Sequence, residues 1–304
     1  MQLIKGDFSV KDIIFQGAAV AIITPFTEDG INFPELARII EDQIAGSTDA
    51  IVITGTTGES ATMTDEEHKA AIRFAVEQTK GRVPVIAGTG SNETVYAVQL
   101  SQYAEQVGAD GLLVVTPYYN KCTQKGLVQH FTAIADAVHI PIILYNVPSR
   151  TGVGIKLETY RELAKHPNIA AVKEASGDLS AILRLRHACG DELAVYSGND
   201  DQIVPILSLG GKGVISVLSN VAPKQTHDIC QLYFAGKVAE SARLQMDYVD
   251  LIDALFCEVN PIPVKTAMRL MGYAAGPLRL PLCEMEDADL AKLKAALVNH
   301  GLLK

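Results

Sequence analysis

The segment NIAAVKEASGD, residues 168 to 178, places a lysine at the end of an apolar run. Lysine is among the residues least often buried, so Lys173 either ends a strand in an ion pair, for instance with Glu174, or has a chemical role. A lysine amine without its proton can attack a ketone and form an imine, and the imine turns the ketone into an enamine nucleophile. Burial favours the neutral amine because it disfavours charge. Lys173 is therefore a candidate nucleophile.

The segment LYNVPSRTG, residues 144 to 152, adds a phenol and a guanidinium. Tyr145 follows an apolar run, and its hydroxyl could carry a proton to and from an imine. Arg150 has the forked geometry that suits a carboxylate, the group that an α-keto acid would bring. The alternatives are a hydrogen-bonded core tyrosine and a solvated loop arginine.

One of two glycine-rich segments could hold an anion. In GTTGES (55–60), backbone amides could bind the anion and Thr56 or Thr57 could pass protons or bind a carboxylate. It lacks the Gly-Lys-Ser/Thr ending of a nucleotide loop, and GTGSNET (88–94) lacks the third glycine of a dinucleotide fingerprint. A plain turn remains the alternative for both, and we expect no nucleotide cofactor.

The elements that would position these residues follow a strand and helix rhythm. Eight short apolar runs are apolar almost continuously, which is typical of parallel strands covered on both faces. They are residues 18–26, 50–55, 83–90, 111–119, 140–148, 168–174, 192–198 and 212–220. Amphipathic segments separate them, with caps expected at Asn32 and at Thr64. Eight such units predict a (β/α)8 barrel, or TIM barrel; an open doubly wound sheet is the competing fold.

From about Thr226 onward the pattern indicates helices alone. This tail is too long to be only the eighth barrel helix. We expect a barrel over residues 1–225 and a C-terminal helical extension over residues 226–304.

In a parallel barrel the active site lies at the carboxyl ends of the strands. Lys173 is the only lysine predicted at such a position, because Lys212 precedes a strand and Lys265 lies in the helical tail. Tyr118 and Tyr119, just past the fourth run, could fill the core, form a lid or anchor an interface.

The bulk composition limits the ligands and the location. The 304 residues are 48% hydrophobic and 20% charged, with a formal net charge of −9 and no basic run, so nothing supports binding to nucleic acid or an anionic membrane. Five distant cysteines and seven histidines show no metal-ligand spacing. Residues 1–13 lack the apolar core of a signal peptide, and no apolar run approaches the roughly 18 residues of a membrane span. We expect a cytoplasmic protein without a metal.

Five motifs together resemble one family. GTTGES, TPYYNK, YNVPSRTG, VKEASGD and SGND, in this order and each at a strand end, are similar to the dihydrodipicolinate synthase family of pyruvate-dependent class I aldolases. The resemblance covers nearly the whole chain. It implies a lyase that condenses pyruvate with L-aspartate 4-semialdehyde on the route to diaminopimelate and lysine, and it favours the chemical role of Lys173.

The resemblance also implies a role for each matching residue. Lys173 would form the Schiff base, so no separate cofactor is expected. Tyr145, Thr56 and Tyr119 match a proton relay in which Tyr119 comes from a neighbouring subunit. The positions that match substrate contacts are Thr57 for the pyruvate carboxylate, Arg150 for the semialdehyde carboxylate, and Gly198 and Ile215 for the pyruvate pocket. A homotetramer built from tight dimers is expected.

Family members that lysine inhibits use an interface pocket. The matching positions are Ser60, Ala61, Asn92 and Tyr118. Asp65 stands where sensitive enzymes often have histidine, and Tyr96 where they have a glutamate that pairs with the lysine amine. Without that carboxylate a desolvated ammonium lacks its charge partner, so we predict weak or absent inhibition by lysine.

Two other functions remain open. A related aldolase that cleaves sialic acid or a 2-keto-3-deoxy sugar acid would use the same lysine and tyrosine, although such relatives usually lack an arginine at the position of Arg150. A non-catalytic small-molecule binder on the same barrel is the second alternative.

Overall fold

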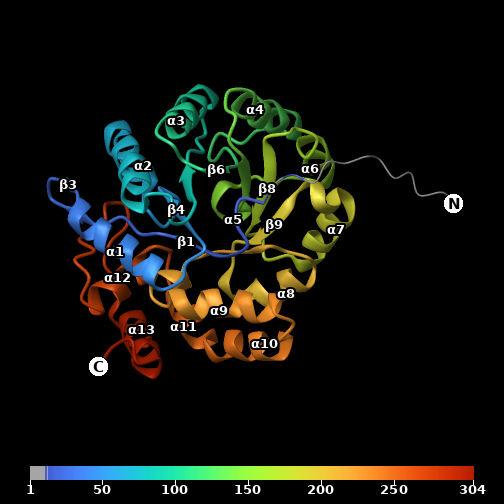
Figure 1. Ribbon diagram of the computed structural model, residues 1–304. Coiled ribbons are helices and arrows are strands. Elements are labelled where there is room, and N and C mark those ends of the chain that lie inside the picture. Colours follow the sequence, from blue (N-terminus) through green and yellow to red (C-terminus); the bar gives the residue numbers. More distant parts are fainter. Residues whose placement is uncertain (1–10, 12) are drawn as a thin grey trace.

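The computed structural model describes residue 11 and residues 13–304. Most of the N-terminal segment for which we expect no signal peptide therefore lies outside the described residues. Eight parallel strands close into a barrel in the order β1, β10, β9, β8, β7, β6, β5 and β4, with β4 pairing β1 (Figure 1). They are β1 Gly17–Ala21, β4 Ala50–Ile53, β5 Val85–Gly88, β6 Gly111–Val115, β7 Ile142–Asn146, β8 Ile169–Glu174, β9 Ala194–Ser197 and β10 Gly213–Ser216. All eight predicted runs form strands, and the open sheet is wrong because the barrel has no edge.

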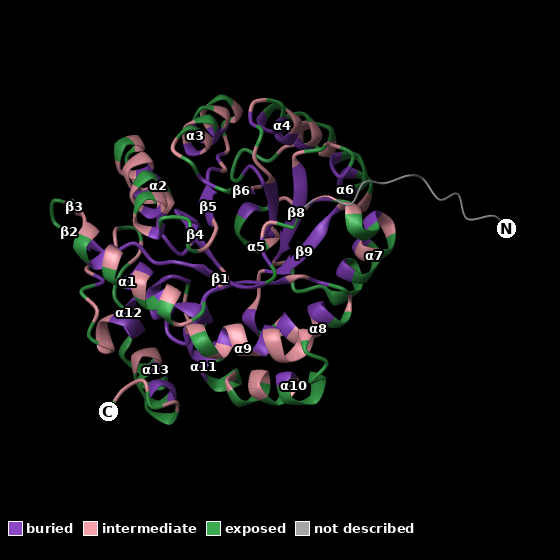
Figure 2. Ribbon diagram, in the orientation of Figure 1, coloured by how far each residue is buried: buried purple, intermediate pink, exposed green. Residues whose placement is uncertain are grey.

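The strands are buried on both faces, which explains their continuous apolar character. In β8, Ala171 belongs to the cluster inside the barrel, whereas Val172 packs outward against the helices. The same alternation places Ile143 of β7 inside and Leu144 outside. Figure 2 shows these buried strands in the middle of the molecule, with the exposed residues on the outer sides of the helices.

Helices follow the strands and surround the barrel. They are α1 Phe33–Ala45, α2 Asp65–Thr79, α3 Thr94–Gln106, α4 Gln124–Asp136, α5 Pro148–Thr151, α6 Leu157–Leu163, α7 Leu179–Cys189, α8 Ile203–Ser208 and α9 Pro223–Phe234. The Asn32 side chain caps α1 by accepting from the Glu35 amide, and Thr64 forms a reciprocal capping box with Glu67 at α2. Both predicted caps are confirmed. A two-stranded hairpin, β2 Phe26–Thr27 with β3 Gly30–Ile31, precedes α1.

The chain ends in helices, as expected. After α9 come α10 Val238–Asp247, α11 Val249–Leu255, α12 Ile262–Leu270 and α13 Asp287–Asn299. Leu251, Val264 and Leu293 of this extension belong to the same apolar cluster as the outer faces of the barrel strands. The division at residues 225 and 226 falls inside α9 and stays a prediction.

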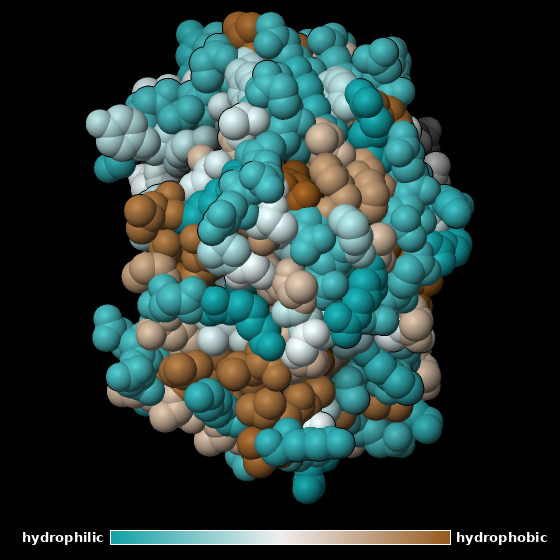
Figure 3. Space-filling model, turned by 90° about the vertical axis from the view of Figure 1, so that its left-hand side faces the viewer, coloured by the Kyte–Doolittle hydropathy of each residue, from teal (hydrophilic) through white to brown (hydrophobic). Residues whose placement is uncertain are grey.

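The C-terminal extension packs near α1, the first helix of the barrel. In Figure 1, α12 and α13 lie on the same side of the molecule as α1 and the projecting hairpin β2–β3, and the segment after α12 contacts α1, because the Ala274 amide donates to Glu35 Oε1 at 2.8 Å. Figure 3 shows this side of the molecule, where hydrophilic residues are interrupted by a hydrophobic band across the lower part. Within the described part of the chain, no helix combines the length and the apolar character needed to span a membrane.

Candidate active site

Lys173 lies inside the barrel at the carboxyl end of β8. In the strand register it stands beside Tyr145 of β7 on one side and Tyr196 of β9 on the other. The residue is only 6% exposed, and its Nζ lies 4.4 Å from the centroid of the Tyr145 ring. Among the described residues Lys173 forms no ion pair, so the strand-end pair with Glu174 is not formed.

Glu174 points to the other side of the strand and has its own partners. Its carboxylate accepts from Asn146 Nδ2 at 2.9 and 3.1 Å, from the Tyr160 hydroxyl at 2.9 Å and from the Ser176 amide at 2.9 Å. Burial, reinforced by the charge of Glu174, raises the pKa of Tyr160, which stays protonated as a donor. Because Asn146 follows Tyr145, this network ties the ends of β7 and β8 together and holds Tyr145 beside Lys173.

A cavity of about 190 Å³ opens above Lys173. Six of the predicted site residues line it: Thr56, Thr57, Tyr145, Arg150, Lys173 and Gly198. Tyr145 and Lys173 lie at the carboxyl ends of β7 and β8, and the other four follow β4, β7 and β9, so the closure of the barrel brings them together. A side chain at Gly198 would lie 2.6 Å from Cβ of Ala175, so the close approach here requires glycine.

Two predicted residues do not line this cavity. Ile215 is fully buried in β10 as part of the barrel interior, and Val217 lines the cavity instead. Tyr119 is 91% exposed, with a left-handed φ of 69°, and does not line the cavity of its own subunit. Within one subunit, the structure does not bring Tyr119 to Lys173.

The structure adds Asn260 of the helical tail, a site residue that the sequence does not predict. Its Nδ2 donates to Thr57 Oγ at 3.0 Å, and its backbone oxygen accepts from Arg150 Nη2 at 3.0 Å. Its Oδ1 is buried and has no hydrogen-bond partner among the described residues. Asn260 therefore links the two residues that match carboxylate contacts. No spacing pattern in the sequence predicts Asn260 as a site residue, because 203 positions separate it from Thr57.

A second cavity of about 390 Å³ adjoins the first and shares Thr56, Val147 and Arg150 with it. Three of the positions that match the lysine pocket line it, namely Ser60, Ala61 and Tyr118. The fourth, Asn92, does not line it; its backbone oxygen accepts from Asn120 Nδ2.

Asp65 and Tyr96, the two residues that depart from the lysine-sensitive pattern, contact each other at this cavity. The Tyr96 hydroxyl donates to Asp65 Oδ1 at 3.1 Å, and Lys69 pairs with the same carboxylate at 2.6 Å. Burial, together with the bond to Asp65, raises the pKa of Tyr96 to about 12. Hydrogen bonding from Lys69 lowers the pKa of Asp65, despite some opposition from burial. The cavity wall thus offers a neutral phenol, and the nearby carboxylate is already paired.

Comparison with known proteins identifies the family. Residues 14–300 match the sequence profile of the Dihydrodipicolinate synthetase family. The chain belongs to this family. Membership of the dihydrodipicolinate synthetase family confirms the resemblance drawn from the five motifs, and it covers the barrel and most of the helical extension.

Individual members of the dihydrodipicolinate synthetase family resemble the chain over its full length. A 4-hydroxy-tetrahydrodipicolinate synthase of Clostridium perfringens is 59% identical over 291 residues, which are 96% of this chain and 100% of that protein. A pyruvate complex of the chloride-inhibited synthase from Acinetobacter baumannii superposes with a TM-score of 0.91 at 42% identity, covering 95% and 99% of the two chains. A synthase from Cyanidioschyzon merolae with lysine bound gives 0.93 at 40% identity, covering 96% and 100%.

Proposed function

We propose that the cavity above Lys173 is the site where this enzyme condenses pyruvate with L-aspartate 4-semialdehyde through a Schiff base. The enzyme is a lyase, and its activity is that of a 4-hydroxy-tetrahydrodipicolinate synthase, given its full-length identity to such synthases. The position of the Lys173 amine, buried at the mouth of the barrel and 4.4 Å from the centre of the Tyr145 ring, supports this site most directly.

The proposed reaction begins with the neutral amine of Lys173. Its nitrogen attacks the C2 carbonyl of pyruvate, and loss of water gives the imine. Loss of a C3 proton gives an enamine, whose C3 attacks the aldehyde carbon of the semialdehyde and forms the new C–C bond. The amino group of the semialdehyde then attacks the imine carbon, which closes the ring and releases Lys173. The Tyr145 hydroxyl, with Thr56 and a partner subunit's tyrosine, would carry the protons.

The carboxylates of both substrates have matching donors. Thr57 Oγ already accepts from Asn260, so its own hydroxyl hydrogen is free to bind the pyruvate carboxylate. Arg150 uses one Nη2 hydrogen on the Asn260 oxygen, which leaves other N–H groups for the semialdehyde carboxylate. A positive side chain at this mouth favours the charged semialdehyde over a sugar aldehyde.

The site is incomplete in one subunit if Tyr119 belongs to the proton relay. Its 91% exposure supports a contact with a second copy, and Tyr118 beside it is also exposed. We therefore propose at least a dimer, and a homotetramer as the expected assembly. We also propose weak or absent inhibition by lysine, and a cytoplasmic location, for which the five free cysteines are the support.

The proposed site can be tested by trapping the imine. Incubation with pyruvate and borohydride is expected to add one reduced pyruvate to Lys173, detected by mass spectrometry of the digested protein. Lys173→Ala should lose the adduct, whereas Lys212→Ala, at the opposite end of the barrel before β10, should keep it. Turnover with aspartate semialdehyde, compared with N-acetylmannosamine, separates the synthase from a sialic acid lyase. An adduct on another residue would overturn the assignment of Lys173.

A further inference from the structure

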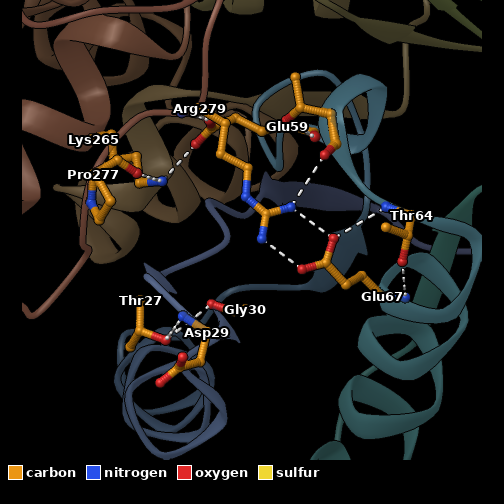
Figure 4. A network of polar contacts seen from close by, with 10 residues as sticks. Thr27, Asp29, Gly30, Glu59, Thr64, Glu67, Lys265, Pro277 and Arg279 are labelled. Carbon is orange, nitrogen blue, oxygen red and sulfur yellow. Dashed lines mark hydrogen bonds and ion pairs between the residues drawn. The ribbon is translucent and has the colours of Figure 1, made fainter.

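A buried ion pair connects the helical extension to the loop that carries Thr56 and Thr57. Lys265 of α12 has no exposed surface, and its Nζ donates to Glu59 Oε1 at 2.6 Å and to the Pro277 oxygen at 2.8 Å (Figure 4). The side chain of Glu59 is likewise fully buried. The Lys265 ammonium also lies 4.4 Å from the centroid of the Phe26 ring.

Arg279 extends this contact to both sides of the loop. Its backbone amide donates to the other Glu59 oxygen at 3.1 Å, and its guanidinium donates to the Thr62 oxygen at 3.1 Å. The same guanidinium forms a bidentate pair with Glu67, at 2.5 and 2.6 Å, as Figure 4 shows. Glu67 caps α2 through the Thr64 amide. The tail thus holds the loop before Thr62 and the helix that follows it.

The loop itself is in a conformation that side chains rarely adopt. Thr54 has a φ of 54° and Glu59 a φ of 58°, both in the left-handed region that favours glycine. Thr56 and Thr57 lie between these two positions. Such a backbone persists only where its surroundings hold it in place, because residues other than glycine are strained there.

The chemistry of the Lys265–Glu59 pair suits a role in positioning the loop better than a role in stabilising the fold. Removing an ammonium and a carboxylate from water costs a desolvation free energy that offsets much of their attraction. Apolar residues of similar volume at such positions often stabilise a protein equally well. An apolar pair would lack directional contacts, whereas the Lys265 ammonium and the Arg279 amide each donate to a different oxygen of Glu59. The segment before α12 adds another contact, because Asn260 donates to Thr57.

We propose that Lys265, Glu59 and Arg279 form a loop clamp, a set of positioning residues by which the C-terminal extension holds Thr56 and Thr57 at the active site. This inference rests on the proposed roles of Thr56 and Thr57. It gives the extension a part in catalysis, because the clamp crosses from α12 to the loop after β4. None of the three clamp residues lines the cavity above Lys173.

A double-mutant cycle on the KM for pyruvate tests the clamp. Lys265→Met replaces the ammonium by an apolar side chain of similar length, and Thr57→Val removes the proposed carboxylate contact. Each single change should raise the KM about 10-fold or more, since small misplacements at an active site are costly. In the Thr57→Val background, Lys265→Met should raise it less than about 2-fold, because both changes remove the same interaction.

The control is Arg269→Gln on the same helix. Arg269 pairs with Glu284 at the surface, and none of its hydrogen bonds within the described chain reaches the loop. This variant should leave KM and kcat unchanged. If Lys265→Met leaves Glu59 as a buried unpaired charge and does not fold, Glu59→Gln/Lys265→Met removes both charges and is judged by the same values.

The outcomes separate the clamp from the site it serves. If Thr57→Val raises the KM, and Lys265→Met raises it by the same factor with and without Thr57→Val, the clamp is wrong but the role of Thr57 stands. So does a Lys265→Met protein with a lower melting temperature but the KM and kcat of the parent. An unchanged KM in Thr57→Val overturns the carboxylate role of Thr57 and, with it, the clamp. The clamp is supported if the effects of Lys265→Met and Thr57→Val on the KM do not add and Arg269→Gln leaves KM and kcat unchanged.

Discussion

Removing only the hydroxyl of Tyr145 isolates its proposed part in proton transfer. In Tyr145→Phe the ring stays in the barrel interior, where it packs in the same cluster as Ile143 and lies against the Lys173 amine. The hydroxyl makes no hydrogen bond to any other residue that the structure describes, so its loss leaves no buried partner unsatisfied. We expect the free energy of unfolding to change by less than about 0.5 kcal/mol.

Turnover should respond far more strongly than stability. A positioned general acid or base contributes on the order of 100-fold or more, so kcat should fall by at least about 100-fold. That factor corresponds to about 2.7 kcal/mol in the activation free energy. Thr57 and Arg150 are untouched by the change, so the KM for pyruvate should stay within about 2-fold of the parent.

The assay compares steady-state turnover with imine trapping in the same preparation. Tyr145→Phe should still give the borohydride adduct with pyruvate at long incubation, but it should form more slowly. The matched control is Tyr196→Phe, on the other strand beside Lys173. The Tyr196 hydroxyl donates to the Phe15 oxygen at 2.6 Å, near the start of β1, so this variant should lose about 1 kcal/mol of stability and keep its kcat.

Two results would refute this reasoning. If Tyr145→Phe turned over at the parental rate, its hydroxyl would have no part in the relay. If Tyr196→Phe lost as much kcat as Tyr145→Phe, the loss would reflect a general loosening of the barrel interior rather than proton transfer.

Two further predictions concern the second cavity and acid stability. Turnover should persist in millimolar lysine, and Tyr96→Glu, which supplies a carboxylate to the second cavity, should make the enzyme sensitive; micromolar inhibition of the parent enzyme in a steady-state assay would contradict this. Burial lowers the pKa of His130 to about 4, from 6.5. The folded state therefore binds fewer protons than the unfolded state between these values, and its stability should fall by about 2 to 3 kcal/mol as the pH drops from 6.5 to 4. His130→Gln should flatten that slope in urea titrations, and an unchanged slope would show that other groups cause the loss.

The sequence was most informative where one local rule decides both structure and position. A strand covered on both faces must be apolar throughout, so the eight runs could be recognised individually and their carboxyl ends assigned to one rim. Tyr145 and Lys173 were predicted in this way, and the register places them side by side. Lys212 was rightly excluded because it precedes β10.

The sequence was least informative about the contacts that the helical extension makes. Lys265 lies in the tail, away from the predicted active site, yet it reaches Glu59 over 206 positions. Asn260 reaches Thr57 over 203 positions. Neither contact follows from a periodic pattern, since both depend on how α12 docks against the barrel. Ile215 shows a different limit of sequence-based prediction. It is buried inside the barrel, and the sequence does not tell how deep the cavity reaches between the strands, so it cannot show whether such a residue lines the cavity or packs below it.

The neighbouring residues Lys173 and Glu174 show how a single strand separates two tasks. Successive side chains of a strand point to opposite faces, so the amine enters the barrel interior while the carboxylate stays among the surrounding helices. Had the two paired with each other, the amine would have been held away from the cavity. Instead, Asn146, Tyr160 and the Ser176 amide satisfy Glu174. The buried carboxylate therefore serves the site by joining β7 to β8, which leaves the nitrogen of Lys173 free to react.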